Sequence, residues 1–118
     1  MARVIVVDDS PIVRTLVSAS LSEEGHEVVE AEHGQEFLDI TEEEDFDTVL
    51  LDIMMPVKNG VDALREFRER GDDTPVILIT SKTEAALSDM FEGLHVSRHM
   101  VKPLTPALLA DAIGALVS

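Results

Sequence analysis

The chain has 118 residues and no cysteine, which predicts a single domain over residues 1–118 without disulfides, a thiolate nucleophile or a cysteine-based metal site. Its formal net charge of −15 argues against direct binding to nucleic acid and favours cationic partners or metal ions, unless the surplus acid is only a solvated surface. No stretch is apolar for long enough to cross a membrane, and the first strand follows Met1 too closely for a signal peptide. We therefore expect a cytoplasmic protein.

Short apolar runs alternate with amphipathic segments along the whole chain, which is typical of repeated βα units around a parallel sheet. The apolar runs predict five strands, at Arg3 to Val7, Glu27 to Ala31, Thr48 to Asp52, Pro75 to Thr80 and Arg98 to Val101. The third and fourth runs have no polar face, so we expect them to be central strands that are buried on both sides.

The first predicted helix begins after Ser10, which can cap it, with Pro11 at the first helical position. Gly25 is the predicted end of this helix. Apolar residues at helical spacing predict its buried stripe: Ile12, Val13, Leu16, Val17 and Leu21.

Four more helices are predicted between and after the remaining strands. One covers about Gly34 to Glu43 and buries Phe37 and Leu38, with Thr41 as a further candidate. After a loop, the next runs from the N-cap Asn59 to about Arg70, with Gly71 as its stop. The inward residues of this helix are predicted to be Val61, Leu64 and Phe67. The helix before the fifth strand is predicted to bury Ala86, Leu87, Met90, Phe91 and Leu94. The last helix is predicted to bury Leu108, Leu109, Ala112, Ile113 and Leu116.

Polar side chains stand at the carboxyl ends of four of the five strands. Asp8 and Asp9 follow the first strand, Asp52 ends the third, Thr80 ends the fourth, and Lys102 follows the fifth. Ligand sites in open α/β sheets lie at this edge, so these groups are expected to converge there. Taken singly, an acid could cap a helix, the threonine could start a turn and the lysine could be an ordinary surface residue.

Three carboxylates in one small volume repel one another unless a counter-charge is present. Oxygen ligands without histidine or cysteine suit Mg²⁺, with Mn²⁺ as the alternative ion. A carboxylate beside such an ion can act as a nucleophile in phosphoryl transfer. We assign this role to Asp52, metal binding to Asp8 and Asp9, and contacts with phosphoryl oxygens to Thr80 and Lys102.

Four motifs resemble the receiver domain of two-component response regulators, the CheY-like family: VIVVDDSP, VLLDIMMPVKNG, VILITS and MVKP, in the family's order and over the whole chain. The resemblance implies a flavodoxin-like, doubly wound α/β fold, with a five-stranded parallel sheet in the order 2-1-3-4-5 and helices on both faces. It also implies Mg²⁺-dependent transfer of a phosphoryl group to Asp52 from a sensor histidine kinase or a histidine phosphotransfer protein. The main-chain carbonyl of Met54 would be a further metal ligand, while the side chains of Met54, Ser81 and Lys82 would flank the phosphoryl group.

The family usually has Tyr or Phe three residues before the lysine, as the partner of the threonine in a conformational switch. This chain has His99 there, a smaller and titratable ring. At the flanking positions, Met54 is expected to limit access of water and Lys82 to add a cation, which favours a long-lived phosphoaspartate.

We therefore predict a stand-alone receiver that is not a turnover enzyme and signals by protein contacts, as a monomer or a phosphorylation-dependent dimer. The expected contact surface is formed by the helix with Ala86 to Leu94, the strand from Arg98 and the helix that begins at Thr105. The alternatives are a phosphorylation-independent docking module, or a fragment of a longer regulator. A phosphohydrolase would need an acid at the position of Met54 as a proton donor, so this alternative is disfavoured. An FMN-binding protein would need a Ser/Thr/Gly-rich phosphate loop where this chain has Asp8 and Asp9, so it is disfavoured too.

Overall fold

The computed structural model describes residues 2–52, 60–80, 98–101 and 107. Five parallel strands form one sheet in the order β2-β1-β3-β4-β5, as predicted. The strands are β1 (Arg3–Val7), β2 (Glu27–Ala31), β3 (Thr48–Asp52), β4 (Val76–Thr80) and β5 (Arg98–Val101). Their predicted bounds are confirmed except for Pro75, which precedes β4. The loop at 53–59 and the two later predicted helices lie outside the described residues.

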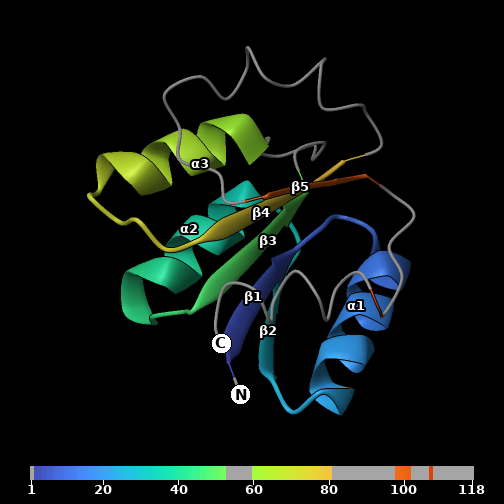
Figure 1. Cartoon of the computed structure of the whole chain (residues 1–118). Helices are drawn as coiled ribbons and strands as arrows, with labels where there is room; N and C mark the ends of the chain where they lie inside the picture. The colour runs from blue at the N-terminus through green and yellow to red at the C-terminus, as the bar shows by residue number, and fades with distance from the viewer. Residues whose placement is uncertain (1, 53–59, 81–97, 102–106, 108–118) are drawn as a thin grey trace.

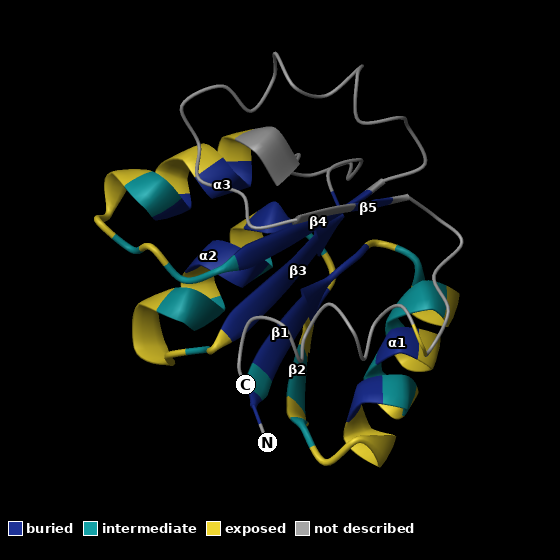
Figure 2. Cartoon of the chain, viewed as in Figure 1, coloured by how far each residue is buried: buried dark blue, intermediate teal, exposed yellow. Residues whose placement is uncertain are grey.

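Helices cover both faces of the sheet, as expected for a doubly wound fold (Figure 1). On one face, α1 (Pro11–Glu23) contributes Val17 and Leu21 to a core cluster that also contains the strand residues Val4, Val6, Leu50, Ile77 and Ile79. On the other face, α2 (Gly34–Glu43) and α3 (Gly60–Glu69) pack together on the sheet. The rings of Phe37 and Phe67 meet there with centroids 5.0 Å apart. Figure 2 shows the resulting pattern: β1 and β3 are largely buried, the edge strand β2 is mostly intermediate or exposed, and the helices are exposed on their outer sides.

The central position of β3 explains its composition. All five of its residues are buried, because β1 and β4 flank it and helices cover both of its faces. Val7 of β1 is in register with Leu51, and Ile79 of β4 is in register with Asp52. The carboxyl ends of these three strands therefore reach the same edge of the sheet.

The ends of α1 follow the predicted signals. The Ser10 side chain accepts a hydrogen bond from the Val13 amide at 3.3 Å, and Pro11 is the first helical residue. After the helix, Gly25 has a φ of +90°, a conformation that glycine adopts without the steric cost of a Cβ. Gly71 has a φ of +86° just after α3, in agreement with its predicted role as a stop.

The predicted buried stripe of α1 is wrong at two positions. Ile12 is 73% exposed and Leu16 is 65% exposed, whereas Val17 and Leu21 are buried and Val13 is partly buried. The buried residues are spaced four apart and form one line on the helix. Ile12 and Leu16 stand one position earlier, about 100° around the helix axis, and so face away from the sheet.

Within the described part of the chain, no helix is both long and apolar enough to span a membrane.

Candidate functional site

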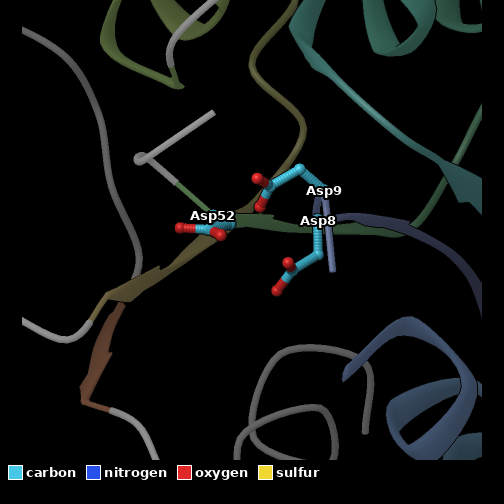
Figure 3. A group of neighbouring side chains, drawn as sticks. All are labelled: Asp8, Asp9 and Asp52. Atoms are coloured by element: carbon cyan, nitrogen blue, oxygen red, sulfur yellow. The ribbon is translucent and has the colours of Figure 1, made fainter. Parts of the chain in front are cut away.

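Three carboxylates meet at the carboxyl edge of the sheet, where β1 and β3 end. Asp8 and Asp9 directly follow β1, and Asp52 is the last residue of β3. Because Val7 and Leu51 are in register, the two strands deliver their acids at the same level. One carboxylate oxygen of each aspartate lies within 4.8 Å of the others, as Figure 3 illustrates. The convergence of Asp8, Asp9 and Asp52 that the sequence predicted is therefore present.

Asp8 is fixed by the turn between β1 and α1. Its side chain is fully buried, and its main-chain amide donates to the Ala31 carbonyl of β2 at 3.1 Å. Its Oδ1 accepts a hydrogen bond from the Ser10 amide at 2.9 Å. This bond stabilises the turn between β1 and Ser10, the N-cap of α1. The segment from Asp8 to Ser10 therefore both starts the helix and orients the Asp8 carboxylate.

The three acids differ in their exposure to solvent. Asp52 is only 3% exposed, and Asp9 is exposed. Two buried carboxylates and a third within a few ångströms are costly in a folded protein, because like charges repel and burial removes the water that stabilises them. The arrangement is thus one that a bound cation would stabilise.

The donor set fits a hard divalent cation. Among the residues that the structure describes, Asp8, Asp9 and Asp52 form the one group of acids or histidines close enough together to hold a metal ion. All of their donor atoms are oxygens, the ligands that Mg²⁺ prefers, and the exposed Asp9 leaves one side open to water or to a substrate oxygen. These residues could therefore hold Mg²⁺.

The other predicted site residues are described only in part. Thr80 ends β4 and pairs through the main chain with Val101, so its backbone reaches the same edge, while His99 pairs with Leu78 further back. Met54, Ser81, Lys82 and Lys102 lie outside the described residues. The roles of all these residues, and a switch from Thr80 to His99, remain predictions.

The sequence analysis missed Arg14, which contacts this site. Its Nη1 donates to the main-chain carbonyl of Asp8 at 2.6 Å. A basic residue one turn into the helix that follows the two acids was a signal that could have drawn attention to it. The contact itself depends on how α1 packs, which the local sequence does not specify.

Comparisons with known proteins agree with this geometry. The family model described as "Response regulator receiver domain" matches residues 4–114. The chain is 32% identical to Protein PilH of Pseudomonas aeruginosa over 120 residues, covering 100% of the chain and 99% of PilH. It is 34% identical to a chemotaxis protein CheY homolog of Campylobacter jejuni, covering 94% of the chain and 88% of that protein.

Some relatives are longer than the chain. Response regulator RR06 of Streptococcus pneumoniae is 33% identical over 97% of the chain, but the match spans only 52% of RR06. The chain therefore corresponds to about half the length of some of the curated relatives that it matches, and to nearly all of PilH.

Solved structures show the same fold. Chemotaxis protein CheY4 of Vibrio cholerae superposes with a TM-score of 0.93 at 29% identity, covering 99% of both chains. Response regulator TrrA of Thermotoga maritima, solved in complex with Mg²⁺-BeF, has a TM-score of 0.86 at 32% identity and covers 99% of this chain and 100% of TrrA.

Proposed function

The chain belongs to the response regulator receiver family of two-component systems, and from this we propose that Asp52 accepts a phosphoryl group in a reaction that depends on a divalent cation. The donor would be a phosphohistidine of a sensor histidine kinase or of a histidine phosphotransfer protein. Receiver domains are signalling modules rather than turnover enzymes, so the phosphorylated chain is the product that carries the signal.

One observation carries this proposal. A carboxylate at the end of the central strand, only 3% exposed, lies within 4.8 Å of two acids from the neighbouring strand. Like charges this close repel one another, and a metal-assisted phosphoacceptor is a role that uses this set of oxygens. The complex of the similar protein TrrA with Mg²⁺-BeF supports the same reading for this chain.

The roles of the residues follow from charge. A carboxylate oxygen of Asp52 attacks phosphorus while the bond from phosphorus to the donor imidazole nitrogen breaks, and that nitrogen keeps the electron pair. Asp8, Asp9, Asp52 and the Met54 carbonyl would hold the ion, and Mg²⁺, or Mn²⁺ in its place, would neutralise charge on the transferred group. The negative charge of Asp8 and Asp9 would oppose the approach of a phosphoryl group, and a bound divalent cation would offset that charge.

Lys102 and Thr80 would stabilise the product by binding phosphoryl oxygens, through an ammonium and a hydroxyl respectively. Movement of Thr80 toward the phosphoryl group would then be coupled to His99 on the adjacent strand. The side chains of Met54, Ser81 and Lys82 would flank the phosphoryl group, and Met54 and Lys82 would control the lifetime of the phosphoaspartate. A decay rate that is the same in wild type, Met54→Asn and Lys82→Ala would contradict this last assignment.

The output would be a protein contact, made by the surface around residues 86–94, β5 and the segment from Thr105. We propose residues 1–118 as one receiver domain, which acts as a monomer or as a phosphorylation-dependent dimer. Nuclear magnetic resonance of the unphosphorylated and phosphorylated chain tests the surface, since the largest amide shifts away from the acids should fall on these segments.

The decisive experiment is incubation with acetyl phosphate and Mg²⁺ followed by intact mass measurement. We expect one phosphoryl adduct in wild type, none in Asp52→Asn and none when EDTA replaces Mg²⁺. Glu43→Gln, which removes one exposed acid from α2, is the matched control and should be phosphorylated normally. The absence of an adduct in folded wild type would reject phosphoryl transfer in favour of a phosphorylation-independent docking module.

A further inference from the structure

Arg14 connects the acidic site to the edge strand of the sheet. It lies one turn into α1, and its side chain is only 12% exposed. Its Nη1 donates to the Asp8 carbonyl at 2.6 Å, its Nε lies 3.5 Å from Glu30 Oε1 and its Nη2 lies 3.7 Å from Glu32 Oε1. A single guanidinium therefore spans the end of β2 and the first residue after β1.

These contacts add to the hydrogen bonds that hold Asp8. The amide of Asp8 donates to the Ala31 carbonyl and its Oδ1 accepts from the Ser10 amide, so Arg14 adds a further fixed point, at the carbonyl. A charged donor forms the stronger kind of hydrogen bond, and the peptide that it holds is the one joining Asp8 to Asp9. The orientation of that peptide sets the direction of the Asp9 Cα–Cβ bond relative to that of Asp8, and so affects how the two carboxylates of the pair are arranged.

The geometry needs arginine rather than any cation. The two glutamates engage Nε and Nη2 on one side of the planar group, which aims Nη1 at the Asp8 carbonyl. Lysine has one compact ammonium on a flexible stem and cannot hold the two glutamates and the carbonyl in a fixed plane at the same time.

We propose that Arg14 is a positioning residue of the metal site: by clamping the Asp8 carbonyl to Glu30 and Glu32, it sets the Asp8–Asp9 peptide so that both carboxylates face Asp52 in the arrangement that binds a divalent cation. This inference rests on the proposed function, because it assumes that the three aspartates bind such an ion. Arg14 itself contacts neither the ion nor the phosphoryl group.

The sign of the effect on metal affinity distinguishes positioning from simple electrostatics. Arg14 is a cation close to an acidic site, so its charge alone opposes the binding of Mg²⁺. If charge were its only influence, Arg14→Met would bind Mg²⁺ more tightly and Arg14→Lys would behave as wild type. If Arg14 positions the acids, both variants bind Mg²⁺ more weakly, although Arg14→Met has lost a repulsive charge.

The experiment is a titration of the unphosphorylated full chain with Mg²⁺, by calorimetry or by amide chemical shifts, at a temperature where each variant is folded by circular dichroism. Mutation of a residue that holds a metal ligand in place typically lowers the affinity for the metal by about 10-fold or more. We expect a loss of Mg²⁺ affinity of that order in Arg14→Met and a smaller loss in Arg14→Lys. If Arg14→Met does not fold, the affinity of Arg14→Lys for Mg²⁺ still tests the proposal.

Arg70→Met is a closely matched control. Arg70 donates from Nη2 to the Leu38 carbonyl at 2.7 Å and lies 3.6 Å from Glu42, so it makes the same two kinds of contact. It follows α3 just before the chain enters β4, at the opposite edge of the sheet from the aspartates. Its loss should lower the melting temperature and leave the affinity for Mg²⁺ within about twofold of wild type, since charges that far apart are largely screened.

Each outcome decides between the readings. Weaker binding in both Arg14 variants, with wild-type affinity in Arg70→Met, supports the proposal. An affinity that is unchanged or tighter in Arg14→Met overturns it, even if that variant is less stable, and leaves the proposed function intact. A wild-type chain that does not bind Mg²⁺ or Mn²⁺ overturns both.

Discussion

Replacing Asp9 with asparagine is expected to stabilise the protein in the absence of divalent cations and to weaken its stabilisation by Mg²⁺. Asp9 is the exposed member of the acidic group, so the substitution removes a charge without opening a cavity. It removes two of the three repulsive carboxylate pairs while leaving Asp8 and Asp52 in place.

The separations give the magnitude. With oxygens within 4.8 Å, each pair costs roughly 1 kcal/mol in a water-like dielectric and roughly 3 kcal/mol at the lower dielectric of a protein surface. Asp9 is exposed, so we take values near the lower bound and expect Asp9→Asn to gain about 1 to 2 kcal/mol in EDTA. For a chain of this size, that corresponds to a rise in melting temperature of roughly 3 to 10 °C.

Magnesium should change this comparison. An ion present at about 100 times its dissociation constant stabilises the folded state by about 2.7 kcal/mol, and a site that has lost one carboxylate gains less at the same concentration. We therefore expect the advantage of Asp9→Asn over wild type to shrink as Mg²⁺ is added, and to reverse at saturating concentrations for the wild type.

The assay is thermal unfolding followed by far-ultraviolet circular dichroism, with EDTA and with a series of Mg²⁺ concentrations. The chain has no tryptophan or tyrosine, so intrinsic fluorescence is a poor probe. Glu43→Gln controls for the change in net charge. If Asp9→Asn is no more stable than Glu43→Gln in EDTA, the carboxylates do not repel as argued, and if Mg²⁺ stabilises Asp9→Asn as much as wild type, Asp9 is not a ligand.

Three further predictions test the scaffold. Ser10→Ala removes the side-chain acceptor for the Val13 amide and should cost about 1 kcal/mol of unfolding free energy in urea titrations, whereas Ser10→Asp, which keeps an acceptor, should cost less. Phe37→Ala removes a fully buried ring and should cost about 3 to 5 kcal/mol, so a loss below about 1 kcal/mol would contradict the packing of α2 on the sheet. Leu16→Ala should change stability by less than about 0.5 kcal/mol, whereas Leu21→Ala on the buried side of the same helix should cost about 2 to 5 kcal/mol; equal losses would show that Leu16 is buried in solution.

Local signals in the sequence predicted the five strands and the three helices that the structure describes. Uninterrupted apolar runs identified the buried strands, because a strand covered on both faces has no solvent side to alternate with, and Ser10 with Pro11 identified the start of α1 because capping involves only neighbouring residues. The acids at the ends of the first and third runs could be expected to meet, since parallel strands share a carboxyl edge. The order of the strands came from the resemblance to a known family, not from local pattern.

Tertiary structure decided what depends on contacts between distant segments. The apolar stripe of α1 is wider than the contact that the sheet offers, so only packing could show that Val17 and Leu21 are buried while Leu16 is exposed. The clamp of Arg14 on Asp8 likewise requires α1, the end of β1 and the acids of β2 to be in place together. Helical periodicity reports which residues share a face, but the neighbouring strands and helices determine which part of that face is covered.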